Sequence, residues 1–142
     1  MGSLIDNVLQ HLAVENQHEM DAMLATLDGE NSVRDEVAGK CYEGNKNVAD
    51  RYAALWRAFP DFNVFPRRLI EAPNCVVMLA DYSGTHRGPY QTLNFGELAP
   101  TGKKFNVKLV NIIDFNGDKI SRETIFMDVA SQIKQLELLK NK

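Results

Sequence analysis

The sequence contains few of the residues from which disulfide-bonded or metal-bound domains are built. Its 142 residues include two cysteines, Cys41 and Cys75, which form no CxxC pair, so we expect both to be reduced core thiols. Only three histidines are present, and His11 and His18 are two helical turns apart, too far to share a metal ion without other ligands. We therefore expect no metal site.

Excess positive charge and long apolar runs are also missing. Sixteen Lys and Arg against 19 Asp and Glu give a net charge of −3, which provides no basic field for nucleic acid or anionic lipid. No apolar run approaches the roughly 20 residues of a membrane span, and Met1-Gly2-Ser3 opens no signal peptide. These absences predict a cytoplasmic protein that binds neither nucleic acid nor membrane.

The composition that remains is that of one globular domain. At 142 residues, of which 44% are apolar, the chain can bury a core without disulfides or metals. No internal repeat, linker or low-complexity segment divides it. We therefore predict a single domain over residues 1–142.

The clearest local pattern is a β-hairpin near the C-terminus. Apolar residues alternate over 105–113, Asn116-Gly117 interrupts them, and a β-rich run follows over 120–127. This pattern predicts two antiparallel strands joined by a tight turn. Asp128 comes next, at the start of a helical pattern, so it is either the N-cap of a helix or a carboxylate that faces a pocket.

The N-terminal segment has the apolar spacing of a helix. The pattern runs from Ile5 to Leu27, and Ser3 is placed to cap it. Asn16 lies on the same apolar stripe, where a polar side chain needs a partner. It either turns toward a polar cavity or begins a second helix in a capping box with Glu19, and we favour the second interpretation.

A second helical pattern, with Asn47 as its expected cap, ends at Phe59 because Pro60 follows. One face of this helix carries an aromatic band that includes Tyr52 and Trp56. Such a band is either part of the core or the wall of a cavity for a flat organic ligand.

Between and after these helices the sequence predicts strands. Apolar residues alternate over 62–70 and 75–83, and a short strand is expected over 32–38. Residues 84–102 form a long Gly- and Pro-rich loop, which we expect to be functional or to form a rim. A short helix over 129–139 ends the chain. Helices that flank a sheet of four or more antiparallel strands predict an α+β fold.

Several polar residues close to the aromatic and β-rich segments are candidates for a site. They are Asp81, His86, Arg87, Asn111, Arg122 and Asp128. His86 and Asp128 each follow an alternating apolar strand, so each could lie at one end of a sheet. On local grounds alone, His86 could equally be a loop histidine that hydrogen-bonds the backbone.

Three motifs in this order resemble the SnoaL-like polyketide cyclase family. They are Gly84-Thr85-His86 within residues 81–89, Pro100-Thr101-Gly102-Lys103, and Gly117-Asp118-Lys119-Ile120 leading to Phe126-Met127-Asp128. Residues 42–44 and 52–62 are similar to a turn and a helix-to-strand segment of the same family. The resemblance covers nearly the whole chain.

This resemblance implies a nuclear-transport-factor-like cone, in which a curved antiparallel sheet wraps around a long N-terminal helix and encloses an apolar pocket. It implies a homodimer formed through the sheet, and a cyclase or isomerase that uses no cofactor. In the characterised cyclases the aspartate that matches Asp128 is the acid/base of an intramolecular aldol condensation, and His86 matches a histidine near the cavity. The implied ligand is an apolar, polyketide-like carbonyl compound.

The implied chemistry is physically reasonable. An aspartate with an ordinary pKa of about 3.9 is a poor base toward a C–H bond beside a carbonyl, and burial among apolar side chains would raise that pKa. A donor such as His86 would stabilise the enolate. The substrate-binding residues that we expect are Tyr52, Trp56, Tyr82, Arg87, Asn111 and Phe126.

A second hypothesis stays open because fold does not determine function. The chain could be a non-catalytic protein that binds a small molecule or acts as a scaffold with the same fold. In that case Asp128 would only cap its helix.

Overall fold

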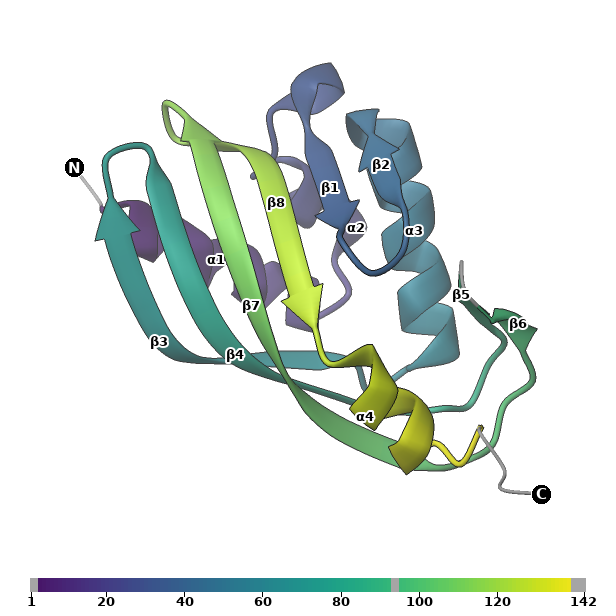
Figure 1. Cartoon of the computed structure of the whole chain (residues 1–142). Helices are drawn as coiled ribbons and strands as arrows, with labels where there is room; N and C mark the ends of the chain where they lie inside the picture. Colours follow the sequence, from purple (N-terminus) through teal and green to yellow (C-terminus); the bar gives the residue numbers. More distant parts are fainter. Residues whose placement is uncertain (1–2, 93–94, 139–142) are drawn as a thin grey trace.

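The computed structural model describes residues 3–92 and 95–138 and has the predicted α+β architecture, a curved sheet with helices against one face (Figure 1). The elements are α1 (Leu4–Asn16), α2 (Met20–Leu24), the 3-10 helix η1 (Gly29–Asn31), β1 (Val33–Glu36), β2 (Cys41–Glu43), α3 (Gly44–Ala58), β3 (Asn63–Ala72), β4 (Cys75–Thr85), β5 (Tyr90–Thr92), β6 (Gly96–Leu98), β7 (Lys104–Asn116), β8 (Lys119–Met127) and α4 (Val129–Gln135).

The main sheet has six strands in the order β2-β1-β8-β7-β4-β3. The predicted hairpins β3–β4 and β7–β8 are both present and antiparallel. Gly117 in the second turn has a φ of +62°, a conformation that glycine adopts without steric cost. One pairing differs from the predicted pattern, since β1 runs parallel to β8.

The core lies between the inner face of this sheet and the helices behind it (Figure 1). Alternate residues of β4 and β7 point inward, as their alternating burial shows. They meet buried residues of α1 and α3. Examples of this core are Val8, Tyr52, Val76, Met78 and Ile113.

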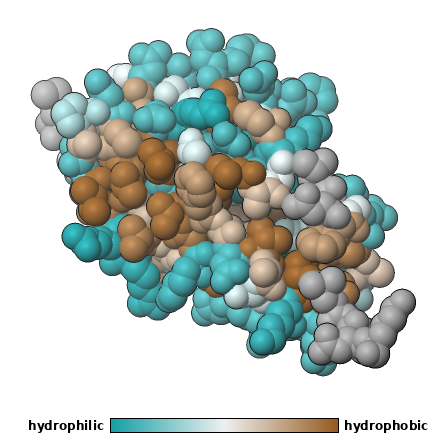
Figure 2. Space-filling model, in the orientation of Figure 1, coloured by the Kyte–Doolittle hydropathy of each residue, from teal (hydrophilic) through white to brown (hydrophobic). Residues whose placement is uncertain are grey.

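The outer face of the sheet carries an apolar surface. Leu79, Val110 and Phe126 are paired neighbours across β4, β7 and β8. Figure 2 shows brown side chains gathered over this face of the molecule. Phe126 is 48% exposed, so it belongs to this surface and not to the wall of an internal pocket.

The first predicted helix is broken where Asn16 was expected to interrupt it. α1 ends at Asn16 and α2 begins at Met20. The predicted capping box is wrong, because Glu19 makes no side-chain cap bond. Asn16 instead bonds both backbone groups of Val64, at 3.0 Å and 2.9 Å, and so fastens the end of α1 to β3.

Three further local predictions need correction. α3 begins at Gly44, and the side chain of Asn47 bonds the carbonyl of Glu43 inside the first turn instead of capping the helix. Cys41 is exposed and Cys75 half-buried, so both thiols are free but neither lies in the core. α4 ends at Gln135, and residue 139, to which this helix was predicted to extend, lies outside the described residues.

The long loop over residues 84–102 contains a small second sheet, the β5–β6 hairpin. This hairpin contributes Tyr90, Thr92 and Phe95 to the wall of a cavity. Within residues 3–92 and 95–138, no helix combines the length and apolar character needed to cross a membrane.

Candidate functional site

A cavity of about 90 Å³ lies between α1, α3 and the inner face of the sheet. Most of its wall is apolar: Leu12, Leu55, Phe62, Val64, Met78, Tyr82, Tyr90, Leu109, Ile113, Ile125 and Met127 take part. Lys40, Tyr42, Arg51 and Thr92 line both this cavity and an adjoining groove of about 670 Å³. The cavity therefore connects to the surface beside these four residues.

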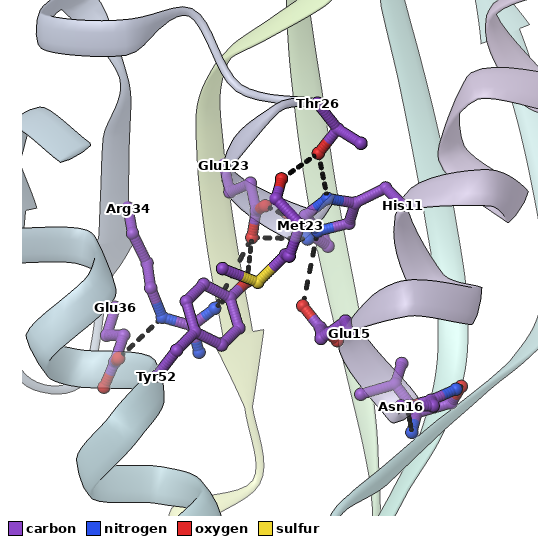
Figure 3. A network of polar contacts seen from close by, with 11 residues as sticks. His11, Glu15, Asn16, Met23, Thr26, Arg34, Glu36, Tyr52 and Glu123 are labelled. Carbon is purple, nitrogen blue, oxygen red and sulfur yellow. Dashed lines mark hydrogen bonds and ion pairs between the residues drawn. The ribbon is translucent and has the colours of Figure 1, made fainter. Parts of the chain in front are cut away.

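Charged residues are gathered in one part of the wall, where Glu123 lies between His11 and Arg34 (Figure 3). His11 is 2% exposed, and its Nε2 lies 3.3 Å from a carboxylate oxygen of Glu15 and 3.3 Å from one of Glu123. Glu15 is one helical turn along α1, whereas Glu123 comes from β8. The arrangement thus joins the first helix to the last strand.

The hydrogen bonds of His11 determine where its protons lie. The hydroxyl of Thr26 donates its proton to the carbonyl of Met23 at 2.6 Å. Thr26 Oγ1 can therefore only accept from His11, so Nδ1 of His11 carries a proton and donates to it, also at 2.6 Å. Nε2 then faces two carboxylates, an arrangement that requires a proton between them. One proton is therefore held among His11 Nε2, Glu15 and Glu123.

The electrostatic surroundings place this proton on His11. Burial alone would lower the pKa of the imidazole, but the hydrogen bonds and negative charges of Glu123 and Glu15 raise it to about 10. Burial likewise opposes the charge of Glu123, and His11, Arg34 and Asn111 outweigh it and lower its pKa. At neutral pH the pair is an imidazolium and a carboxylate.

Further donors hold Glu123 in place. Its Oε2 accepts from Arg34 Nη1 at 3.5 Å, from the Tyr52 hydroxyl at 3.4 Å and from Asn111 Nδ2 at 3.4 Å. Arg34 Nη1 also donates to the Tyr52 hydroxyl at 2.9 Å. Burial is the main reason that the pKa of Tyr52 lies well above its usual value, so Tyr52 acts as a neutral donor.

A second ion pair extends the cluster toward the mouth of the cavity. Glu36 accepts from Arg34 Nε at 2.9 Å and from Arg51 Nη2 at 2.7 Å. Burial would raise the pKa of Glu36, but the two guanidinium groups lower it. Three positive groups (His11, Arg34 and Arg51) and three carboxylates (Glu15, Glu36 and Glu123) thus form this cluster, and Lys40 adds a fourth positive group to the cavity wall.

Asp128 does not line the cavity, although its neighbours Met127 and Val129 do. Its side chain is exposed and accepts from Ser131 N at 3.0 Å and Ser131 Oγ at 2.6 Å, which makes it the N-cap of α4. The hydrogen bonds from Ser131 lower the pKa of this carboxyl. The geometry is the one that the helix-capping interpretation describes, and it provides neither burial nor a raised pKa for a base.

His86 is fully buried but is not part of the cavity wall. Its Nδ1 accepts from the backbone N–H of Thr101 at 3.3 Å, and its ring contacts Phe59 and Tyr90. Burial lowers its pKa. His86 therefore ties the 84–102 loop to the core, and the structure does not bring it together with Asp128 at one cavity.

The residues expected to bind substrate are divided. Tyr82 and Asn111 line the cavity, and Tyr52 lies behind the wall as a partner of Arg34 and Glu123. The other three lie elsewhere: Trp56 stacks on His18 at 4.7 Å, and Arg87 and Phe126 are exposed. Of the remaining candidates, Asp81 pairs with Arg67 and Lys108, and Arg122 with Asp35.

The functional candidates that sequence reasoning missed are His11, Glu15, Arg34, Glu36, Arg51 and Glu123. Two patterns pointed to three of them. His11 and Glu15 are spaced i,i+4 on an apolar helix face, and Glu123 occupies an inward position of an apolar strand, where a charge requires a partner. Among the described residues, no group of three His, Cys, Asp or Glu side chains is arranged to hold a metal ion.

Comparison with solved structures supports the fold. A protein from Jannaschia sp. CCS1 named as a SnoaL-like polyketide cyclase superposes with a TM-score of 0.83 at 17% identity, over 96% of this chain and 93% of that one. An NTF2-like protein from Burkholderia thailandensis E264 superposes with a TM-score of 0.78 at 20% identity, over 96% of this chain and 98% of that one. A Catenulispora acidiphila protein with a ketosteroid isomerase-like fold, solved in complex with trimethylamine, superposes with a TM-score of 0.77 at 15% identity, over 92% of each chain.

The sequence itself carries the family assignment. A search of curated proteins found no significant match. The family model described as SnoaL-like polyketide cyclase, however, matches residues 5–136, which is nearly the whole chain. Together with the nuclear-transport-factor-like fold, this match shows that the chain belongs to the SnoaL-like polyketide cyclase family.

Proposed function

We propose that the protein is a cofactor-free enzyme of the cyclase or isomerase type, which moves a proton at a carbon atom beside a carbonyl group. One observation carries the proposal: a proton is held between His11 Nε2 and two buried carboxylates in the wall of a largely apolar cavity. Such a cluster can accept a proton from one position of a substrate and return it at another.

Glu15 is the proton acceptor that we favour. Glu123 is bound by His11, Arg34, Tyr52 and Asn111, and its lowered pKa makes it a weak base. Glu15 is 4% exposed and also lines the cavity, so water solvates its carboxylate poorly. Glu123 then acts as a positioning residue that holds the His11 imidazolium.

Asp128 is the competing candidate, because the family resemblance implies the acid/base role for the aspartate at this position. Its exposure and its bonds to Ser131 argue for a capping role instead. Substitution of the two carboxylates separates these alternatives, since Glu15 and Asp128 lie on different elements and share no hydrogen bond.

The experiment measures exchange of hydrogen for deuterium at the carbon beside the carbonyl of a probe ketone, acetophenone, in D₂O by NMR. We expect the wild-type protein to accelerate exchange and Glu15→Gln to reduce that acceleration by about 100-fold or more, the usual contribution of a general base. Asp128→Asn serves as the matched control and should retain the rate. Circular dichroism establishes that each variant is folded.

Two results would reject this assignment. If Asp128→Asn abolishes exchange while Glu15→Gln does not, the family-implied aspartate is the base. If the folded wild-type protein binds the ketone but exchanges no hydrogen, the alternative of a non-catalytic binding protein is supported. That alternative has an observation in its favour, because the six charges of the cluster balance one another without a ligand.

A further inference from the structure

Two buried polar atoms in the cavity wall have no hydrogen-bond partner among the described residues. They are the hydroxyl oxygen of Tyr82 and the Oδ1 oxygen of Asn111, whose residues are 5% and 6% exposed. Both residues line the cavity. A buried polar group without a partner is costly, and a site built to bind a polar ligand is a common reason for one.

The two atoms differ in what they can bind. Burial raises the pKa of Tyr82 well above its usual value, so its hydroxyl keeps its proton and can donate. Asn111 must direct its NH₂ group toward the Glu123 carboxylate, 3.4 Å away, because a carboxylate only accepts. Its Oδ1 is therefore left as an acceptor that calls for a donor from a ligand.

The two groups also lie at different depths. On β4, Tyr82 is four residues beyond Met78, the residue that pairs with Asn111 of β7. Four residues of strand span roughly 13 Å, and an even separation keeps both side chains on the inner face. One ligand oxygen would thus bind near Tyr82 and another near Asn111, closer to the charged cluster.

The size and charge of the cavity limit the ligand between these two contacts. A volume of about 90 Å³ corresponds to roughly six to nine water-sized groups at about 10–15 Å³ each. The part of the site enclosed by the sheet and helices thus has room for about one ring with short substituents, and a larger compound would extend into the adjoining groove. The six cluster charges are buried and paired with one another, so a charged ligand beside them would disturb that pairing. Lys40, the remaining charged residue of the wall, is exposed at the mouth.

We propose that the cavity binds a small, uncharged hydroxy-carbonyl compound of about one ring, with its carbonyl oxygen on the Tyr82 hydroxyl and its own hydroxyl on Asn111 Oδ1. This proposal rests on the proposed function, for which it names the substrate class. Through this hydrogen bond Tyr82 would stabilise negative charge that develops on the carbonyl oxygen.

The test is a set of binding titrations, by NMR, with three probes of one size. 4-Hydroxyacetophenone carries both oxygen functions, acetophenone lacks the hydroxyl and 4-ethylphenol lacks the carbonyl. We expect Tyr82→Phe to weaken the binding of the two ketones by about three- to tenfold and to leave the affinity for 4-ethylphenol unchanged. Asn111→Leu should weaken the binding of the two phenols by a similar factor and leave the affinity for acetophenone unchanged, as expected for one lost hydrogen bond.

Tyr90→Phe is the matched control. Tyr90 also lines the cavity, but its hydroxyl already donates to Gln132 Oε1 at 3.0 Å. Removal of the Tyr90 hydroxyl should therefore weaken the binding of all three probes equally or leave all three affinities unchanged. The same pattern for Tyr82→Phe would overturn the proposal.

Two further outcomes also decide against the proposal. Absence of binding by all three probes would reject the ligand class, and tighter binding of 2-hydroxyanthraquinone, a rigid fused compound, would reject the size limit. Binding is measured without turnover. If the probes bind with the expected pattern but no hydrogen exchange occurs, the proposed catalytic function is rejected. The assignment of the ligand contacts to Tyr82 and Asn111 then stands.

Discussion

The charge on His11 makes the stability of the fold depend on pH in a way that one substitution can test. Its pKa rises from 6.5 to about 10 on folding. The native state therefore keeps a proton that the unfolded chain loses above about 6.5. The stabilisation is fully present below that pH, declines as the pH rises, and is lost above about 10.

The magnitude follows from linkage. Each pH unit between the two pKa values lowers the free energy of unfolding by about 1.4 kcal/mol. The full interval therefore corresponds to a loss of about 5 kcal/mol. Between about pH 7 and 8.5 the loss is about 2 kcal/mol. The groups around His11 do not obscure this range. The pKa of Glu123 is lowered, that of Tyr52 is raised well above 10, and burial lowers the pKa of His86 below 6.5.

The assay is urea denaturation followed by the fluorescence of Trp56, at several pH values in that range. The free energy of unfolding of the wild-type protein should fall by about 2 kcal/mol, whereas that of His11→Gln should stay nearly constant. Asp128→Ala is the control, because loss of a helix cap lowers stability at every pH without changing its slope. NMR titration of the His11 ring gives a second readout if His11→Gln fails to fold.

A wild-type stability that is flat over this range would refute the reasoning, as would a His11 ring that loses its proton near pH 6.5. Either result would mean that burial cancels the effect of the two carboxylates on the pKa of His11. The proton shared in the cluster would then be carried by a carboxyl group, and the assignment of acid and base would have to be exchanged.

Two other predictions concern the surface. Asp128→Ala removes the bonds to Ser131 at the start of α4 and should lower Tm by about 4 °C, measured by calorimetry; an unchanged Tm would mean that the cap adds nothing. The homodimer implied by the family should use the apolar surface of Leu79, Val110 and Phe126, so Phe126→Lys should convert a dimer to a monomer in analytical ultracentrifugation. A dimer that persists in this variant would place the interface elsewhere. Arg68→Glu on β3, where Arg68 pairs with Leu79 of β4, is a comparison that changes charge without removing apolar area.

The elements that short-range patterns encode were predictable. Alternation and the Asn116-Gly117 pair predicted the β7–β8 hairpin, and Asn16 marked the break between α1 and α2. These features depend on neighbours in sequence. The partner of Asn16 was not predictable, because Val64 is 48 residues away and the contact exists only after β3 has docked on α1.

The site was harder to predict because the six residues of its charged cluster come from four elements. Glu123 on β8 meets His11 on α1 only when β8 has joined the sheet, and the parallel pairing that places Arg34 beside it has no sequence signature. Local chemistry did identify one role of Asp128, as a helix cap. The cavity could be anticipated only in part, through Tyr82 and Asn111.

The break after Asn16 and its clamp on Val64 have a consequence for biosynthesis. His11 and Glu15 lie in the first helix, and Glu123, the second carboxylate that holds His11, lies more than a hundred residues later. A ribosome-bound chain thus carries His11 with Glu15 but without Glu123 until β8 emerges. We expect α1 to remain undocked until then, so that closing the amino-terminal helix over the sheet and assembling the proton-holding group are one event.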